Sequence, residues 1–238
     1  EQRTVPFEVS APGTVEPIRA VAVTAQVSGL VTGVRFREGD LVEAGQVLVE
    51  IDPRPYRNAL QQAEASLARD LIQLDNARRQ VERYQGLAQS EYITSEQYET
   101  LKTNAAALAA TIQSDSAAVS NARRNLDNTT IRAPISGRTG SLLIKEGNLV
   151  RAQGGEPLVL VNQIRPILIR FAVPASFLPT IRARRGDELV VKAVPGQDST
   201  ELVGRLLFVD NAVDTTTGTI LLKGQFANAD GMLWPGQF

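Results

Sequence analysis

The sequence predicts an elongated, multidomain α+β protein. A long antiparallel helical hairpin is inserted into a split β-sandwich, and the sandwich is itself nested in a small β-barrel. Three observations lead to this prediction. A motif between Ala25 and Ile51 recurs between Ala133 and Val161, the sequence between the two copies carries helical heptads, and strand-like alternation flanks both copies.

The two copies of the motif share Ser-Gly and Glu-Gly dipeptides at the same spacing. Ser28-Gly29 precedes Glu38-Gly39 by the interval at which Ser136-Gly137 precedes Glu146-Gly147. Apolar residues alternate with polar ones, which is typical of short strands, and we interpret the glycines as turn formers with positive φ. Neither copy alone could bury an apolar face, so we expect residues 23–52 and 130–163 to form one pseudo-symmetric domain.

Residues 53–129 are predicted to form the hairpin. Asp52-Pro53 suits a helix start, because a carboxylate can accept hydrogen bonds from the first amides and proline fits the first helical position. Apolar residues follow at heptad spacing. The first arm has Leu60, Leu67, Leu74, Val81 and Ala88, with Ala63, Asp70, Ala77 and Tyr84 between them, and the second has Tyr98, Leu101, Ala105, Leu108, Ile112, Asp115, Val119, Ala122 and Leu126. Arms of roughly 35 residues would reach about 50 Å.

The start of the second arm carries two helix signals. Thr94 and Gln97 have the spacing of a capping box, and Ile93 and Tyr98 occupy the positions of a hydrophobic staple. We therefore expect an ordered turn at the hairpin tip.

Both arms place an aspartate in the seam. Folding the hairpin near residue 91 brings Asp70 and Asp115 to similar heights. Two facing carboxylates in a dry seam would be costly, so we expect one to turn toward water or to meet an arginine. We interpret the pair as a polar layer, with a proton-relay role as the alternative.

Residues 1–22 and 164–238 are predicted to form an incomplete β-barrel domain that ends at the start of a membrane-proximal region. The strand-like segments include Thr4–Val9, Gly13–Ala20, Leu189–Val194, Val203–Val209 and Thr219–Phe226, with the last two joined across residues 210–218. The chain begins amid strand-like sequence and stops just after Pro235-Gly236, so we expect it to be a piece of a longer protein.

Composition argues against catalysis and against cofactors. The 238 residues include no histidine and no cysteine, which removes most nucleophile–base pairs and the usual ligands of zinc, copper and iron–sulfur centres. The formal net charge is −1, so no nucleic-acid partner is expected. No apolar run is long enough to span a membrane. We predict that the chain is not an enzyme and has no catalytic, cofactor-binding or metal-binding residues.

The repeated motif resembles the halves of lipoyl and biotinyl carrier domains. In such domains the modified lysine lies on the turn between the halves, whereas that junction here is Ile51-Asp52-Pro53-Arg54. Lys145 lies elsewhere, before the second Glu-Gly, and is interpreted as an exposed strand-end residue. A carrier function is therefore disfavoured, but it remains an alternative.

Further motifs complete the pattern. They are Gln26-Val27-Ser28-Gly29, Glu38-Gly39-Asp40, Ile51-Asp52-Pro53, Thr130-Ile131-Arg132-Ala133-Pro134-Ile135-Ser136-Gly137, Thr217-Gly218-Thr219-Ile220 and Leu233-Trp234-Pro235-Gly236. With these motifs, a lipoyl-like fold split by a hairpin and followed by a barrel resembles the periplasmic adaptor, or membrane fusion protein (HlyD-like), family of tripartite resistance-nodulation-division (RND) efflux pumps. The resemblance covers essentially the whole chain.

The resemblance implies a function and a set of partners. The chain would be a periplasmic adaptor, attached to the inner membrane of a Gram-negative bacterium through parts outside the present sequence. It would bridge an inner-membrane drug/proton antiporter of the RND class to an outer-membrane, TolC-like channel. Six copies would align their lipoyl-like modules and hairpins into a sealed conduit. An adaptor for an ATP-driven exporter or for type I secretion is the alternative within the same architecture.

The resemblance also implies a docking motif at the hairpin tip. In the family an arginine, a leucine four residues later and a serine seven residues after that contact the outer-membrane channel. Arg83, Leu87 and Thr94 occupy this spacing, with threonine in place of the usual serine. The alternatives are a solvated arginine, a leucine at the edge of the seam and a threonine that acts only as a helix cap.

Overall fold

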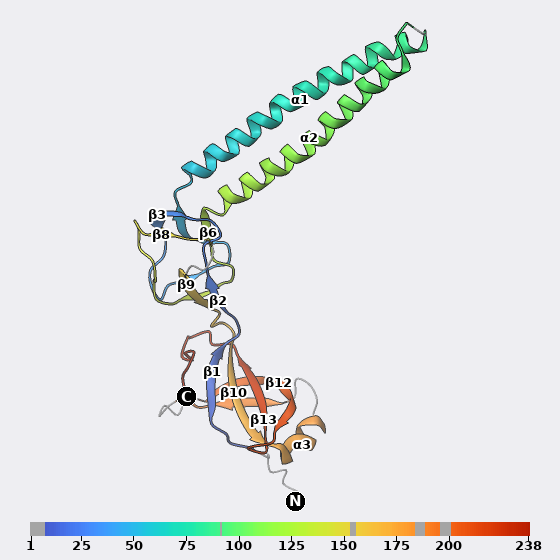
Figure 1. The fold of residues 1–238 in the computed structure, drawn as a ribbon. Helices are drawn as coiled ribbons and strands as arrows, with labels where there is room; N and C mark the ends of the chain where they lie inside the picture. Colours follow the sequence, from blue (N-terminus) through green and yellow to red (C-terminus); the bar gives the residue numbers. More distant parts are fainter. Residues whose placement is uncertain (1–7, 91, 153–155, 184–188, 196–200) are drawn as a thin grey trace, which may run out of the picture.

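The computed structural model describes residues 8–238 except 91, 153–155, 184–188 and 196–200. Three parts follow one another along an elongated molecule (Figure 1). The helical hairpin projects from one side of a small β-sandwich, and the larger β-sheet domain lies on the other side of the sandwich. This arrangement confirms the predicted fold class.

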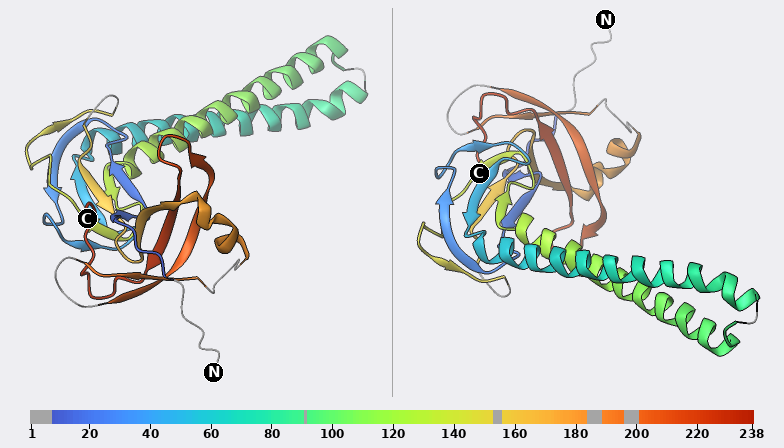
Figure 2. Two further views of the ribbon diagram at one scale, coloured as in Figure 1. Left: turned by 90° about the horizontal axis from the view of Figure 1, so that it is seen from below. Right: turned by 90° about the horizontal axis from the view of Figure 1, so that it is seen from above.

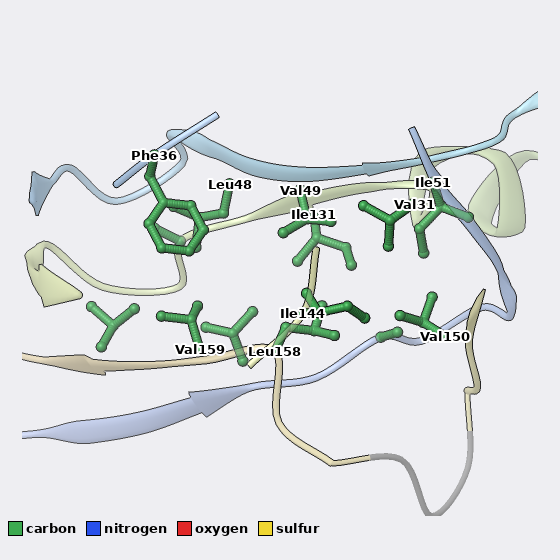
Figure 3. Close-up of a cluster of buried hydrophobic side chains, with 14 of the residues drawn as sticks. Val31, Phe36, Leu48, Val49, Ile51, Ile131, Ile144, Val150, Leu158 and Val159 are labelled. Atoms are coloured by element: carbon green, nitrogen blue, oxygen red, sulfur yellow. The ribbon is translucent and has the colours of Figure 1, made fainter. Parts of the chain in front are cut away.

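The sandwich consists of two four-stranded sheets, and each sheet takes two strands from residues 20–51 and two from residues 130–162. One sheet has the order β2-β9-β7-β4 and the other β6-β5-β3-β8. The strands are β2 (Ala20–Val23), β3 (Gly29–Val34), β4 (Leu41–Val42), β5 (Val47–Ile51), β6 (Thr130–Arg132), β7 (Gly137–Thr139), β8 (Leu149–Val150) and β9 (Val159–Asn162). Between the sheets, Leu48 and Ile131 face Val159 in a common apolar core (Figure 3).

The two halves exchange equivalent contacts. Gly29 pairs with Val150, and Gly137, the repeat equivalent of Gly29, pairs with Val42. The Ser28 hydroxyl accepts a hydrogen bond from the Ala152 amide at 2.9 Å, and the Ser136 hydroxyl accepts one from the Ala44 amide, also at 2.9 Å. The Ser-Gly dipeptide thus ties each half to the other.

The glycines of the repeat serve two different purposes. Gly39 and Gly147 lie in turns with φ of 81° and 86°, as predicted. The prediction is wrong for Gly29 and Gly137, which lie in strands and have no positive φ. A Cβ atom on Gly137 would lie 2.4 Å from the Asn162 carbonyl oxygen, and one on Gly29 would lie 2.6 Å from the Ile51 side chain. These two positions require glycine because another chain segment packs against them.

The hairpin consists of α1 (Arg54–Gln89) and α2 (Ser95–Asp127), which run antiparallel and side by side (Figures 1 and 2). Every predicted seam residue is buried or half-buried, which confirms the heptad pattern. The first helix begins one residue later than expected, because Pro53 is its N-cap residue and not its first residue. Asp52 still accepts a hydrogen bond from the Arg54 amide at 3.0 Å, and the Tyr56 hydroxyl donates to the Ser28 carbonyl at 2.5 Å.

The larger β-domain is a five-stranded antiparallel sheet of order β1-β10-β13-β12-β11, which curves around its own apolar core (Figure 2). Its elements are β1 (Gly13–Pro17), β10 (Ile167–Pro174), β11 (Val190–Ala193), β12 (Leu202–Asp214) and β13 (Thr219–Phe226), with the short 3-10 helix η1 (Ala175–Phe177) and α3 (Leu178–Ala183) after β10. The connection predicted across 210–218 is shorter, because β12 continues to Asp214 through two register shifts. Of the predicted strand Thr4–Val9, residues 4–7 lie outside the described residues, and 8–9 are not in a strand.

The aspartate pair lies in the seam as predicted. Asp70 is 6% exposed and is held in a bidentate ion pair by Arg69, whose Nε and Nη2 lie 2.6 and 3.1 Å from its two carboxylate oxygens. Asp115 Oδ2 is buried and has no hydrogen-bond partner. The arginine therefore pairs with Asp70, and Asp115 Oδ2 is left in the seam without a hydrogen bond.

The two aspartates titrate in opposite directions. Hydrogen bonds from Arg69 lower the pKa of Asp70 below its ordinary value of 3.8. Burial, followed by the interaction with the Asp70 carboxyl group, raises the pKa of Asp115 above the same value. Because the folded-state pKa of Asp115 is raised, its contribution to stability is lost as the pH rises through that pKa. The contribution of Asp70 is instead lost when the pH falls below 3.8 through its lowered pKa.

The hairpin should therefore be more stable at mildly acidic pH, just above the ordinary aspartate pKa, than at neutral pH. Asp115→Asn should raise the melting temperature at neutral pH and flatten its pH dependence above pH 3.8. Thermal melts followed by far-UV circular dichroism measure this change, since α1 and α2 hold most of the helix. Asp75→Asn, at an exposed position of α1, is the matched control. Equal pH dependence in the parent and Asp115→Asn would contradict the assignment.

Candidate functional site

The hairpin tip carries the residues that the sequence singled out. Arg83 and Leu87 lie one helical turn apart in the last two turns of α1, and both side chains are exposed. Leu87 is 40% exposed, so it is not part of the seam. Within the described part of the chain, Arg83 has no ion-pair partner. Its guanidinium remains available to a carboxylate or to a carbonyl group of another molecule.

Thr94 is the N-cap residue of α2 and forms the predicted capping box. Its hydroxyl accepts a hydrogen bond from the Gln97 amide at 3.3 Å, and the Gln97 side-chain oxygen accepts one from the Thr94 amide, also at 3.3 Å. The cap uses an acceptor lone pair of the hydroxyl and leaves its proton unused. The cap is thus confirmed, and the exposed hydroxyl can still donate to a partner.

Tyr92 is a further tip residue that sequence reasoning missed. Its side chain is 81% exposed, and its amide donates a hydrogen bond to the Leu87 carbonyl at 3.0 Å, which folds the chain back over the end of α1. Exposed aromatic side chains are enriched at binding hot spots. Tyr92 lies outside the heptad pattern and next to the Thr94 cap, and this combination was the available clue.

A local ion pair lies at the base of the hairpin, between Asp52 and Arg54. Hydrogen bonds from the Arg54 guanidinium, followed by one from its amide, lower the pKa of Asp52 from 3.8 to about 2. A hollow of about 490 Å³ beside this junction is lined by charged residues that include Glu50, Arg57, Asp127 and Arg132. Ile51, Pro53 and Leu126 supply the apolar part of its lining.

Asp210 and Asp214, at the C-terminal end of β12, accept hydrogen bonds from nearby backbone amides. Asp210 accepts a hydrogen bond from the Asn211 amide at 2.7 Å, and Asp214 accepts one from the Thr216 amide at 2.8 Å, which lowers the pKa of Asp214. Among the residues that the structure describes, no group of three or more histidine, cysteine or acidic side chains could hold a metal ion. Over the same residues, no helix is long and apolar enough to cross a membrane.

Lys145, the lysine considered for a carrier function, is exposed in a turn, where its carbonyl accepts from the Asn148 amide. The turn precedes β8 and is not part of the junction between the two halves, which is formed by residues 51–54. No feature of this turn sets the lysine apart from an ordinary surface residue.

Comparisons with known families agree with this architecture. The family model of the barrel-sandwich hybrid domain of RND membrane fusion proteins matches residues 19–162, and the model of their β-barrel domain matches residues 166–238. The crystal structure of MacA from Actinobacillus actinomycetemcomitans superposes with a TM-score of 0.76 at 23% identity, covering 96% of this chain and 75% of that one. A MacA–MexA chimera that contains the Pseudomonas aeruginosa MexA α-hairpin domain gives a TM-score of 0.66 at 27% identity, with 94% and 77% covered.

Curated relatives match over the full length of the chain. Multidrug resistance protein MdtA of Erwinia amylovora is 38% identical over 239 residues, covering 100% of this chain and 59% of the relative. MdtA of Yersinia enterocolitica is 38% identical over 244 residues, covering 100% and 55%. The chain thus spans little more than half the length of these relatives. Because the two domain models match nearly all of it and the strands, hairpin and barrel lie where those domains require them, the chain belongs to the RND membrane fusion protein family.

Proposed function

We propose that this chain is the greater part of a non-catalytic periplasmic adaptor of a tripartite multidrug efflux pump. The adaptor joins an inner-membrane drug/proton antiporter of the RND class to a TolC-like outer-membrane channel, and it is attached to the inner membrane through parts outside this sequence. The observation that carries the proposal is a long two-helix rod with exposed side chains near its capped tip, in a member of the RND membrane fusion protein family.

The rod has the dimensions of a spacer. The 36 residues of α1 correspond to about 54 Å of helix. Its seam is continuous, and its two ends are fixed by the Asp52 and Tyr56 hydrogen bonds at the base and by the capping box at the tip. Such a rod supports a role in spanning a distance between two partners.

The tip supports a docking role. Arg83 and Leu87 offer one cation and one apolar side chain on the same helical face, and the Thr94 hydroxyl lies just beyond the turn. Arginine pairs well with the carboxylates and carbonyl groups of a partner helix. Tyr92 adds an exposed aromatic ring to the same end of the rod.

The outer faces of the rod support self-association, with six copies forming a sealed conduit. Leu71 and Ile72 of α1 lie outside the seam. They are apolar and yet 47% and 64% exposed. On α2, the face that is turned away from the seam carries small exposed residues such as Ala110. Large apolar side chains on one flank and small ones on the other suit a head-to-tail ring contact.

Reversal of the charge at Arg83 should separate docking from folding. In the full-length protein, Arg83→Asp should abolish drug resistance in cells and crosslinking to the channel, while helix content and association with the inner membrane stay unchanged. Arg78→Asp reverses an exposed arginine of α1 on another side of the helix and is the matched control. Resistance that survives Arg83→Asp would exclude the docking role.

The two roles of Thr94 can be separated with two substitutions. Thr94→Ala should destabilise the start of α2 by about 1 kcal/mol and weaken binding to the channel, because both the cap acceptor and the exposed donor are lost. Thr94→Ser should preserve the melting temperature and channel crosslinking, since the hydroxyl is retained. If Thr94→Ala matches the parent in both measurements, neither role holds.

Disulfide formation in cells can test the conduit. Helical phase places Ile72 opposite the seam positions 70 and 74, and Ala110 opposite the seam positions 108 and 112. Two adjacent helices then separate these outward positions by about 20 Å, which is too far for an intramolecular disulfide bond. The chain has no cysteine of its own. Ile72→Cys combined with Ala110→Cys should therefore yield crosslinked ladders, and each single variant should not. Absence of the ladder in the double variant would count against lateral packing of the rods.

A further inference from the structure

A narrow neck joins the sandwich to the barrel. It consists of residues 18–19, between β1 and β2, and residues 163–166, between β9 and β10. Within the neck the Gln163 amide donates a hydrogen bond to the Arg19 carbonyl at 2.8 Å, while the flanking strands belong to separate sheets on either side. No β-sheet continues through the two segments of the neck. The neck can therefore bend or twist with little loss of packing.

One side-chain contact bridges the two modules beside the neck. The guanidinium carbon of Arg138, in β7 of the sandwich, lies 4.5 Å from the ring centroid of Trp234, in the segment that follows β13 of the barrel. This distance is that of a cation–π interaction. The two residues are far apart in the sequence, so the contact depends on the relative placement of the modules.

Each partner is held firmly by its own module. The Nε atom of Arg138 donates to the Gly39 carbonyl at 2.8 Å, which orients the guanidinium plane. Within the described residues, no carboxylate forms an ion pair with Arg138. Among the described residues, the Trp234 indole is the group that lies opposite this cation across the gap between the modules.

On the barrel side, the backbone around Trp234 is anchored at both ends. Leu233 is 2% exposed, and the buried Asn228 side chain bonds to both backbone groups of Leu233 and to the Ile164 carbonyl, all at 3.0 Å. After Trp234, the Gly236 amide donates to the Val15 carbonyl at 2.8 Å. These bonds tie the backbone of Leu233 and Gly236, which flank Trp234, and the Ile164 carbonyl to the barrel.

We propose that Arg138 and Trp234 form an interdomain latch that holds the sandwich and the barrel in the extended arrangement, and that its opening lets the two modules rotate about the neck. The indole is 55% exposed, so the contact is weak enough to open and close readily. Its loss should change the ratio of rotated to extended molecules by roughly two- to fivefold. The latch concerns the arrangement of this chain alone and does not depend on the proposed pump partners.

Pulsed electron–electron resonance on the full-length protein can test the latch. Spin labels on Glu43→Cys in the sandwich and Asn211→Cys in the barrel occupy exposed positions, and the described chain has no other cysteine to label. Arg138→Met and Trp234→Leu should each broaden the distance distribution and increase the second population by that factor. The double substitution should add nothing further, because both changes remove the same contact.

Two matched variants control for general effects. Arg151→Met removes another exposed sandwich arginine, and Phe238→Leu removes another exposed aromatic side chain of the barrel. Neither should alter the distribution. Unchanged distributions in Arg138→Met and Trp234→Leu, or an equal broadening in the controls, would overturn the latch.

Fluorescence of residues 1–238 provides an independent readout, because Trp234 is the only tryptophan among them. A guanidinium over one face of the indole shields that face from solvent. Arg138→Met should therefore increase acrylamide quenching of Trp234 and shift its emission, whereas Arg151→Met should leave both unchanged. If quenching in Arg138→Met equals that of the parent, the contact does not form in solution and the latch is excluded.

Discussion

The reciprocal packing of the two half-motifs is the constraint on which the rest of the molecule depends. Each half holds about half of an apolar face, and side chains such as Leu48 and Val159 reach 0% exposure only because the other half covers them. Burial of each such side chain contributes about 1.5–3 kcal/mol, and none of it is available to one half alone. The pairing also places Ile51 beside Thr129, whose carbonyl accepts from the Ile51 amide at 2.8 Å. The two helices therefore leave the sandwich side by side.

The helical rod takes its direction from that junction and its stiffness from the seam. Asp52 and Tyr56 fix the entry of α1, and the heptad residues keep the arms in contact over their length. The polar layer at Asp70 and Asp115 interrupts an otherwise apolar seam. Misaligned arms would bury these carboxylates against apolar groups, so the layer favours one register. A rod of fixed register presents its tip residues at a defined height.

Most of the fold could be predicted because its determinants are periodic or local. The heptads set the seam, and Thr94 with Gln97 set the start of α2 through contacts three residues apart. The predictions were wrong at positions where one residue type can serve two different structural purposes. Gly29 and Gly39 look alike in a sequence, but the first is required by close packing and the second by a positive φ. Pro53 likewise suits two adjacent positions at a helix start.

Some residues of the candidate site could also be predicted from the sequence, and others could not. The spacing of Arg83, Leu87 and Thr94 could be recognised in the sequence, and the exposure of Arg83 and Leu87 follows from the heptad phase of α1. Tyr92 was missed because an exposed aromatic ring in a turn has no periodicity to mark it. The contact between Arg138 and Trp234 joins residues that only the complete fold brings together, so no local pattern could indicate it.

The interleaved halves also dictate an order of events during folding. The sandwich cannot close until the chain has been made as far as Asn162, and without the hairpin the chain between β5 and β6 would be a long open loop. Closing such a loop costs entropy that grows with its length, whereas a helical hairpin zips up through local contacts. Early formation of the rod would hold the two waiting half-sheets together. The helical rod would then also promote folding of the sandwich, because it brings the two halves of the sandwich together.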